Sequence, residues 1–439
     1  MNKKLTLGLG FLILCSACAP SAIDEAPNED VDTDGTSTPD SDGNESGEVV
    51  LNFWHIDPGE KGAVYERAVE RFEENHPNAQ VNVLRIPNDD YKQRMVVAMS
   101  GGDPLDVFHS WGGSWLNEFV EAGSVMSLDQ TDVDFDQYLD VALDNATFEE
   151  EIYGVPLGVS LTLFFYNTGI FEELELDTPK DYDEFITVVE TLRDNDYYPL
   201  ALANQTGWTG AYYQEYLVNR LAGEGLYDDA LQREGAGFDD ENYVRANEKI
   251  QDLVDMDAFN PGFNGIPYDA GQGRQLMYSE QAAMMLITTS FLNNVRDEAP
   301  QYEDDLGVFP FPTIEGGEGD GSNLLGSGAP VWSVYEDTEH EELAIELIKE
   351  LSNEETSIDY MDSTASMSAY EGLQSDDAFV QQFIDLLQDA NYLGMPYDQT
   401  MPPSVAQVHL DAAQEVLGNT LTPEEAADLV EEAAQNSLD

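Results

Sequence analysis

The chain has 439 residues, and its 88 Asp and Glu against 17 Lys and Arg give a formal net charge of −71. A charge of this size and sign excludes attraction to nucleic acid or to an anionic membrane surface. Since 42% of the residues are hydrophobic, a chain of this length can still bury a substantial core, and we expect the acids to coat its surface.

Such a surface repels itself in a dilute medium. In about 1 M salt the Debye length falls to ~3 Å, which screens most of the repulsion. We therefore predict a halophilic source, in which the protein faces saline outside the cell.

The first 17 residues have the pattern of a signal peptide. Lys3 and Lys4 precede an apolar run from Leu5 to Ala17. This run of about 13 residues is shorter than the roughly 20 that a transmembrane helix needs. We expect residues 1–17 to be a signal peptide rather than a membrane span.

Both cysteines, Cys15 and Cys18, stand at the end of this run. Their C-x-x-C spacing would indicate a redox pair at a helix start in a βαβ unit, which is not the setting here. Ser16-Ala17-Cys18 resembles the bacterial lipobox, which predicts lipidation of Cys18; cleavage and release of the protein is the alternative.

Residues 18–48 form the expected tether behind that cysteine. They are rich in acids and small polar residues and contain no Lys or Arg. A segment with so few large apolar residues does not bury enough surface to fold.

The body begins with a repeating strand and helix pattern. Residues 48–55 and 79–86 have the β-branched and aromatic composition of strands, and residues 62–77 between them have helical spacing that ends at Pro77. Residues 91–111 then predict a helix, a Gly-rich turn and a third strand. This rhythm is typical of an α/β fold with a mostly parallel sheet.

Two later helices carry start signals. Thr338 with Glu341, and Thr422 with Glu425, have the spacing of a capping box, and Pro423 suits the first position of a helix. We assign the apolar stripes of these helices to the core.

Catalytic motifs are missing from the sequence. It contains no G-x-S-x-G, H-E-x-x-H, P-loop or post-strand G-x-G-x-x-G, and its five histidines are scattered. We predict neither an enzyme nor a metal or cofactor site.

Tryptophans at turns are the more informative feature. Trp54 and Trp111 end predicted strands, and Trp208 lies in a loop with Gly, Thr and Asn. In open α/β sheets, ligands bind beyond the carboxyl ends of the strands, so these side chains are candidates for a site. For Trp115 and Trp332 we favour packing.

Several segments, taken in order, resemble one family. They include RFEENHPNAQVNV, MSGGDPLDVFHSWGGSWLNEFVEAGSVMSL, IYGVPLGVSLTLFFYNTGIFEEL, TPKDYDEF, EQAAMM and DLGVFPFP. This set is similar to the family 1 extracellular solute-binding proteins of carbohydrate ABC importers, the relatives of maltose-binding protein, over nearly all of residues 49–439.

The resemblance implies a two-lobe periplasmic-binding-protein fold, type II-like, in which each lobe has a mostly parallel sheet flanked by helices. The N-lobe would comprise residues 49–158 and 306–355, and the C-lobe residues 159–305 and 356–439. We expect the chain to pass between lobes near Val159, Leu306 and Thr356.

The resemblance also implies a function. The interlobe cleft would close on a mono- or oligosaccharide, and the protein would deliver it to the membrane permease subunits of an ABC importer. We expect a monomer that touches the membrane only through its lipid anchor, on the extracellular face or in the periplasm.

Eight residues match positions where the family contacts or borders its ligand. Phe291 stands in for a tryptophan of the family, and Asp398 matches an acid that accepts hydrogen bonds from sugar hydroxyls. The full set is Trp54, His55, Ser110, Trp111, Ser160, Trp208, Phe291 and Asp398.

Two other functions remain open. The pairs Tyr197-Tyr198 and Tyr212-Tyr213 would suit a binder of a non-sugar solute such as ferric iron. A secreted hydrolase is the other alternative.

Overall fold

Two β-sheets organise the computed structural model of this protein, which describes residues 49–100 and 104–438. The first sheet has the strand order β2-β1-β3-β12-β6, and we call it and its helices the N-lobe. Its strands are β1 (Val49–His55), β2 (Ala79–Arg85), β3 (Val107–Ser110), β6 (Val155–Pro156) and β12 (Val331–Val334).

The second sheet has the order β14-β11-β7-β9-β8, with β10 and β13 also paired to β7, and it organises the C-lobe. Its strands are β7 (Gly158–Asn167), β8 (Tyr198–Leu200), β9 (Ala282–Thr288), β10 (Leu306–Phe309), β11 (Leu324–Ser327), β13 (Met367–Ser368) and β14 (Leu393–Gly394). A separate two-stranded ribbon joins β4 (Thr147–Phe148) to β5 (Glu151–Ile152). The described residues belong to one compact unit.

The predicted strand and helix rhythm is confirmed at the start of the N-lobe. Strand β1 runs parallel to β2 along its whole length and parallel to β3 at Phe53 and Trp54. Helix α1 (Gly59–Asn75) connects β1 to β2, and α2 (Asn88–Met99) follows β2. The carboxyl ends of these parallel strands therefore meet at one edge of the sheet.

One strand in each sheet runs against its neighbours. Strand β12 is antiparallel to β3 and β6, and β7 is antiparallel to β9, β10, β11 and β13. The α/β architecture is thus confirmed, but the expectation of mostly parallel sheets is wrong, because two of the four strand pairs in the first sheet and four of the six in the second are antiparallel.

The chain passes between the sheets at sites that differ in part from the expected ones. It leaves β6 and enters β7 around Leu157, but the expectation of a passage near Leu306 is wrong. Strand β10, which begins there, pairs with β7 in the second sheet. The return to the first sheet comes at residues 328–330, between β11 and β12, because DLGVFPFP adds a strand to the C-lobe before the chain leaves it.

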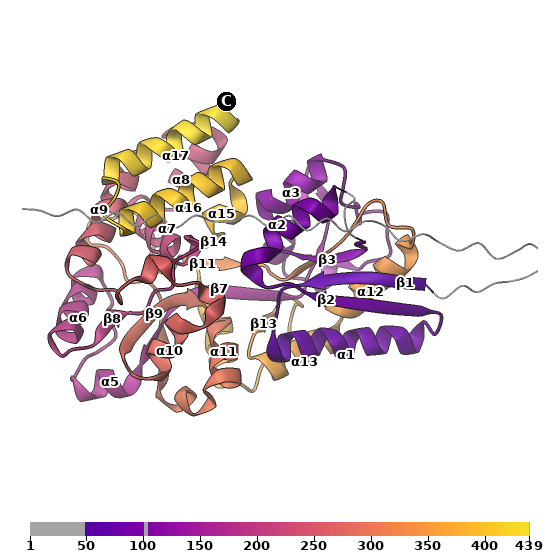
Figure 1. Ribbon diagram of the computed structural model, residues 1–439, viewed down its shortest axis with the longest axis horizontal. Helices are drawn as coiled ribbons and strands as arrows, with labels where there is room; N and C mark the ends of the chain where they lie inside the picture. The colour runs from indigo at the N-terminus through magenta and orange to yellow at the C-terminus, as the bar shows by residue number, and fades with distance from the viewer. Residues whose placement is uncertain (1–48, 101–103, 439) are drawn as a thin grey trace, which may run out of the picture. The chain divides into compact units, whose positions relative to one another are not determined.

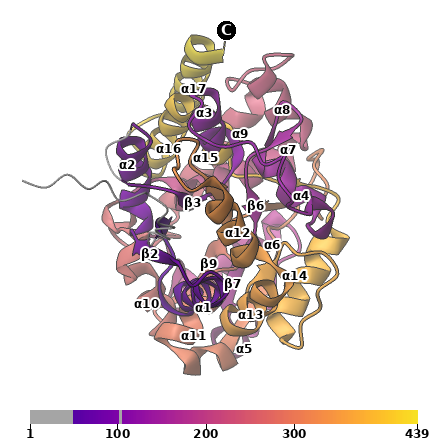
Figure 2. The ribbon, with the colours of Figure 1, turned by 90° about the vertical axis from the view of Figure 1, so that its right-hand side faces the viewer.

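The last passage follows α13 (Glu354–Thr364), after the expected position near Thr356. Arg67 of α1 pairs with Asp359 of α13 (2.7 Å), and Arg71 pairs with Glu350 of α12, the helix Glu341–Ser352 (2.7 Å). Figure 2 shows α12 and α13, drawn in orange, beside the indigo α1. Strand β13, a few residues later, pairs with β7.

Helices cover both sheets (Figure 1). Those of the N-lobe that are not yet named are α3 (Gly113–Glu121) and α4 (Asp140–Leu143). Those of the C-lobe are α5 (Thr168–Glu173), α6 (Tyr182–Asp194), α7 (Trp208–Ala222), α8 (Gly225–Gln232), α9 (Glu241–Asp255), α10 (Gln272–Tyr278), α11 (Phe291–Glu298), α14 (Ala378–Asp389), α15 (Tyr397–Thr400), α16 (Pro403–Leu417) and α17 (Pro423–Leu438). Short 3-10 turns lie at Phe135–Gln137, Asp144–Ala146, Phe263–Gly265, Tyr268–Ala270 and Pro300–Asp305.

The capping box at Thr422 is confirmed. The Glu425 amide donates to Thr422 Oγ1 (3.2 Å), and the Thr422 amide donates to a carboxylate oxygen of Glu425 (3.0 Å). The one expected at Thr338 is wrong, since α12 begins at Glu341. The Thr338 hydroxyl instead donates to Asp106 (2.6 Å).

The core confirms two assignments made from sequence. Trp115 and Trp332 are buried, at 6% and 0% exposure, among apolar residues of the N-lobe.

Over residues 49–100 and 104–438, none of the helices combines the length and the apolar character that crossing a membrane requires.

Candidate ligand-binding site

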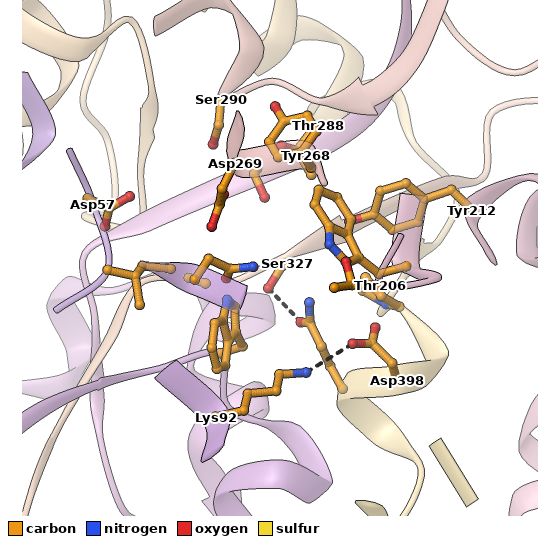
Figure 3. Close-up of a pocket in the computed structure, with 18 of the residues that line it drawn as sticks. Asp57, Lys92, Thr206, Tyr212, Tyr268, Asp269, Thr288, Ser290, Ser327 and Asp398 are labelled. Carbon is orange, nitrogen blue, oxygen red and sulfur yellow. Dashed lines mark hydrogen bonds and ion pairs between the residues drawn. The ribbon is translucent and has the colours of Figure 1, made fainter. Parts of the chain in front are cut away.

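A cavity of about 710 Å³ is lined by residues of both lobes (Figure 3). Its N-lobe wall lies at the carboxyl ends of β1, β2 and β3, where open α/β sheets bind ligands. The side chains of this wall that matter below are Asp57, Lys61, Arg85, Lys92, His109 and Trp111.

The C-lobe wall combines two helix starts, a strand end and a loop. Trp208 and Tyr212 lie in the first turns of α7, and Asp398 lies in α15. Thr288 and Ser290 stand where β9 ends and α11 begins. Tyr268 and Arg274 complete the part of this wall discussed here.

The indole of Trp208 is held edge-on by two tyrosines. Its ring centre lies 5.6 Å from that of Tyr212 and 5.0 Å from that of Tyr268, with interplanar angles of 75° and 71°. Its Nε1 is buried and has no hydrogen-bond acceptor among the described residues. A ligand in the cavity could supply one, because a buried indole N–H normally finds a partner.

Trp111 lies on the opposite wall in a similar aromatic setting. The rings of Tyr91, His109 and Trp115 meet it edge-on at 5.8, 5.1 and 5.2 Å. The ammonium of Lys92 lies 5.0 Å from its centre, within the range of a cation–π contact. These contacts hold the indole in one orientation at the cavity wall.

Lys92 also joins the two walls. Its Nζ donates to Asp398 Oδ2 over 3.2 Å, as the dashed line in Figure 3 shows. The Asp398 side chain is 10% exposed and the Lys92 side chain 40%, so the carboxylate is the more sheltered partner.

His109 adds a neutral polar group to the cavity floor. The residue is 2% exposed, and neither ring nitrogen has a hydrogen-bond partner in the described part of the chain. Burial lowers the pKa of His109 to about 4, against a smaller opposing effect of Asp57. A neutral imidazole offers one N–H donor and one acceptor, which suits a ligand hydroxyl.

The eight residues expected from sequence divide evenly. Trp111, Ser160, Trp208 and Asp398 line the cavity, whereas Trp54, His55, Ser110 and Phe291 do not. Those four are buried in the core, at 2%, 3%, 0% and 0% exposure respectively. Cys18 lies outside the described residues.

The first strand shows why position along a strand does not settle exposure. Both faces of its sheet are covered, so neither face of β1 reaches the cavity. His55 packs on Phe53 and Tyr65, while Trp54 belongs to the cluster that contains Tyr91 and Phe108.

Ser110 and Phe291 do not line the cavity, but the residue next to each of them in the sequence does. Ser110 Oγ accepts a hydrogen bond from the Gly112 amide (3.3 Å) and so shapes the turn that presents Trp111. Phe291 packs edge-on against Phe165 and stacks on Tyr278, at 5.1 and 6.0 Å, while Ser290 before it lines the cavity.

Sequence reasoning missed the cationic residues of the cavity: Lys61, Arg85, Lys92 and Arg274. The signal that could have found these four residues is the scarcity of Lys and Arg in the chain. With only 17 Lys and Arg in the whole chain, each position that carries one is informative, whereas an acid is expected almost anywhere.

The tyrosine pairs that suggested ferric iron do not gather at the cavity. Tyr212 lines it, but Tyr213 is 1% exposed in the core, and Tyr197 and Tyr198 are not part of the lining. Across the described ranges, no group of three or more His, Cys, Asp or Glu side chains is placed to hold a metal ion. This arrangement lends the iron hypothesis no support.

Comparisons with known proteins agree with this geometry. Residues 57–357 match the family model described as bacterial extracellular solute-binding protein. The chain is 24% identical over 332 residues to the multiple sugar-binding protein of Streptococcus mutans, covering 72% of this chain and 74% of that protein. It is also 24% identical over 388 residues to the galactooligosaccharide-binding protein of Bacillus subtilis, covering 86% and 84%.

A solved structure is similar over almost the whole described fold. That structure comes from work on xylan utilisation by the thermophilic bacterium Caldanaerobius polysaccharolyticus. It superposes on the present protein with a TM-score of 0.81 at 26% sequence identity. The similarity covers 88% of the present chain and 99% of the other.

Proposed function

Because the chain belongs to the bacterial extracellular solute-binding protein family, we propose that it captures a saccharide outside the cell and delivers it to the permease subunits of an ABC importer. The similar proteins named above bind multiple sugars and galactooligosaccharides, which supports a saccharide as the ligand. The protein acts as a monomer and releases its ligand chemically unaltered.

The observation that carries this proposal is the pairing of two indoles, one from each lobe, in a single cavity. Trp111 and Trp208 both line it, together with the hydroxyls of Ser160, Thr288 and Ser290. A sugar presents C–H faces that pack on indole rings and hydroxyls that need hydrogen-bond partners. This set of side chains supplies both.

The energies suffice for useful affinity. Neutral hydrogen bonds contribute about 0.5–1.5 kcal/mol each, and those to a charged group such as Asp398 about 1.5–3 kcal/mol. A few of these with indole packing reach the roughly 8 kcal/mol of a micromolar complex. A ligand that contacts both lobes stabilises the closed arrangement through its differential affinity alone.

Location follows from the start of the chain. Residues 1–17 act as a signal peptide, Cys18 carries the lipid, and the acidic residues after it form the tether; all of these lie outside the described residues. The charge of −71 suits a saline exterior, in which about 1 M salt reduces the Debye length to ~3 Å.

Calorimetric titration in about 1 M NaCl with maltotriose, raffinose and galactotriose tests the function. At least one of these should bind the wild type, and Trp111→Ala and Trp208→Ala should each weaken it by about tenfold or more, or roughly 1.4 kcal/mol. Tyr153→Ala, which removes a ring outside the cavity lining, is the control.

Two outcomes contradict the proposal. Unchanged affinity in both tryptophan variants would show that neither indole contacts the ligand. Recovery of a cleaved saccharide after incubation would favour the hydrolase alternative.

A further inference from the structure

Two tyrosines flank the indole of Trp208 (Figure 3), and they are held in different ways. Tyr212 follows Trp208 by one turn of α7, is 4% exposed and belongs to the core of the C-lobe. Side chains at i and i+4 lie on one face of a helix, so α7 itself fixes this contact. Tyr268 lies instead in the short 3-10 turn Tyr268–Ala270 and is only partly buried. Its ring therefore needs support from outside that turn.

Arg274 supplies this support. Its Nη1 donates to the carbonyl oxygen of Tyr268 over 3.0 Å, and its guanidinium carbon lies 5.0 Å from the centre of the Tyr268 ring. This distance is within the range of a cation–π contact. The same ring meets the Trp208 indole at 5.0 Å and an interplanar angle of 71°. Arg274 thus holds both the backbone and the ring of the tyrosine that borders the indole.

Arg274 is itself held in place by Glu298. Its Nε and Nη2 donate to the two carboxylate oxygens over 3.0 and 2.6 Å, and a guanidinium fork matches a carboxylate in this bidentate manner. The Arg274 side chain is 7% exposed. Because Arg274 lies in α10 and Glu298 at the end of α11, the guanidinium connects two helices to the turn that carries the tyrosine.

Direct contact with a ligand would be another role for Arg274, because this residue lines the cavity. Each of its three guanidinium nitrogens, however, already donates to an acceptor of the protein. A side chain with these partners is better placed to orient its neighbours than to exchange them for a sugar hydroxyl.

We propose that Arg274 is a positioning residue for Trp208 and acts through Tyr268. The guanidinium, held by Glu298, fixes the tyrosine ring and so fixes the orientation in which the indole meets a saccharide. The proposal rests on the saccharide-binding function above, and it adds a residue that shapes the site without having to touch the sugar.

An indole that is oriented before the ligand arrives costs less to bind. Each side chain that a ligand has to immobilise lowers the affinity by about 2- to 12-fold. Orientation also decides whether the Trp208 Nε1–H, which is buried and has no acceptor among the described residues, reaches an acceptor on the ligand. Loss of the guanidinium should therefore weaken binding even though the indole stays in the cavity wall.

The first measurement uses the protein without ligand. Near-ultraviolet circular dichroism is lost when the packing of aromatic rings fluctuates, and the contribution of Trp208 is the difference between proteins with and without it. The wild type minus Trp208→Ala gives this contribution in the intact site. Arg274→Met minus the double variant Arg274→Met with Trp208→Ala gives it without the guanidinium. We expect the second difference to be less than about half of the first.

The second measurement is calorimetric titration in about 1 M NaCl with each of maltotriose, raffinose and galactotriose that binds the wild type. Arg274→Met should weaken this binding by about threefold or more. In the Trp208→Ala background the same substitution should change the affinity by less than about twofold, which is the scatter expected of independent sites. A merely structural role of Arg274 would not depend on the presence of Trp208.

Arg296→Met is the matched control. Arg296 lies in α11 of the same lobe, donates to both carboxylate oxygens of Glu303 over 3.0 and 2.5 Å, and is not part of the cavity lining. Its loss removes a similar ion pair and should leave the Trp208 difference spectrum and the affinity unchanged. If Arg274→Met does not fold, Arg274→Lys, which keeps the charge beside Glu298 but not the fork, is measured in its place with the same expectations.

The outcomes separate the two proposals. An unchanged Trp208 difference spectrum in the Arg274 variant would show that the guanidinium does not orient the indole. An affinity that the Arg274 substitution leaves unchanged, or lowers equally with and without Trp208, would also overturn the positioning role and leave the saccharide function intact. If none of the three sugars binds the wild type, the proposed function fails, and the difference spectra decide the positioning of the indole by themselves.

Discussion

The ammonium of Lys92 lies 3.2 Å from a carboxylate oxygen of Asp398 and joins helix α2 of the N-lobe to α15 of the C-lobe. The same ammonium lies 5.0 Å from the centre of the Trp111 ring. Lys92 and Asp398 are 306 positions apart in the chain. This contact brings one charge of each lobe, and one indole, to the same part of the cavity.

Asp398→Asn should weaken saccharide binding by about tenfold or more. The carboxylate is sheltered, and hydrogen bonds to a charged group contribute about 1.5–3 kcal/mol. Calorimetric titration measures the change. Asp385→Asn, at an exposed acid of α14 that accepts from Gln381, is the control; equal affinity in both variants would mean that Asp398 does not contact the ligand.

The Lys92–Asp398 pair itself should add little to stability. Exposed ion pairs typically contribute about 0.2–1 kcal/mol, and the Lys92 side chain is 40% exposed. A double-mutant cycle with Lys92→Met and Asp398→Asn, read from chemical unfolding, should give a coupling below about 1 kcal/mol, smaller at about 1 M than at 0.1 M salt. A coupling that grows with salt would contradict this account.

Gly113→Ala should damage the site more than Gly123→Ala. Both glycines have positive φ, +59° and +69°, and a non-glycine residue there costs about 1–3 kcal/mol. A Cβ at Gly113 would also overlap the backbone carbonyl of Gln399, next to Asp398, whereas nothing lies within 4 Å of one at Gly123.

Thermal melting and saccharide titration check this comparison. The Gly123 variant should lose some stability and keep its affinity, while the Gly113 variant should lose both. Equal effects of the two substitutions would show that α3 and α15 adapt to the added methyl group.

His109 should make stability depend on pH in a defined window. Its pKa falls from 6.5 to about 4 on folding, so between these values the unfolded chain binds the extra proton. The contribution of the neutral His109 to the free energy of unfolding is therefore fully present above pH 6.5. It decreases as the pH falls to 4, by about 3 kcal/mol at most.

The measurement is the free energy of unfolding against pH for the wild type and His109→Gln in the same salt. The difference between the two curves removes the titration of the many carboxylates they share. The wild-type curve should fall relative to the variant between pH 6.5 and 4. Parallel curves would show that His109 is protonated as easily in the fold as in water.

Salt should stabilise the protein. At −71 its surface repels itself, and the Debye length shortens from about 10 Å at 0.1 M to ~3 Å at 1 M salt. The melting temperature should therefore rise over this range of NaCl. A melting temperature that is equal or higher in low salt would end the halophilic proposal.

The first elements of the N-lobe could be predicted from local sequence signals. Strand β1, helix α1 and strand β2 follow from β-branched alternation, helical spacing and a proline stop, because each of these signals is local. The capping box at Thr422 is likewise complete within four residues. The resemblance added the second lobe, which no local pattern required.

The passage between lobes and the composition of the cavity wall depended on distant contacts. The segment at Leu306 reads as a strand in any sheet, and only its pairing with β7 assigns it to the C-lobe. Trp54 lies one residue before the end of β1 and Trp111 directly follows β3, yet Trp54 is buried in the core while Trp111 lines the cavity.

The acidic composition, the order of the elements and the family could be read from the chain before folding, because composition, periodicity and motif order are properties of the sequence. Folding alone brings Lys92 to Asp398 and Lys61 to Ser290. Those neighbours come from separate elements, and the free energy of packing both lobes brings them together.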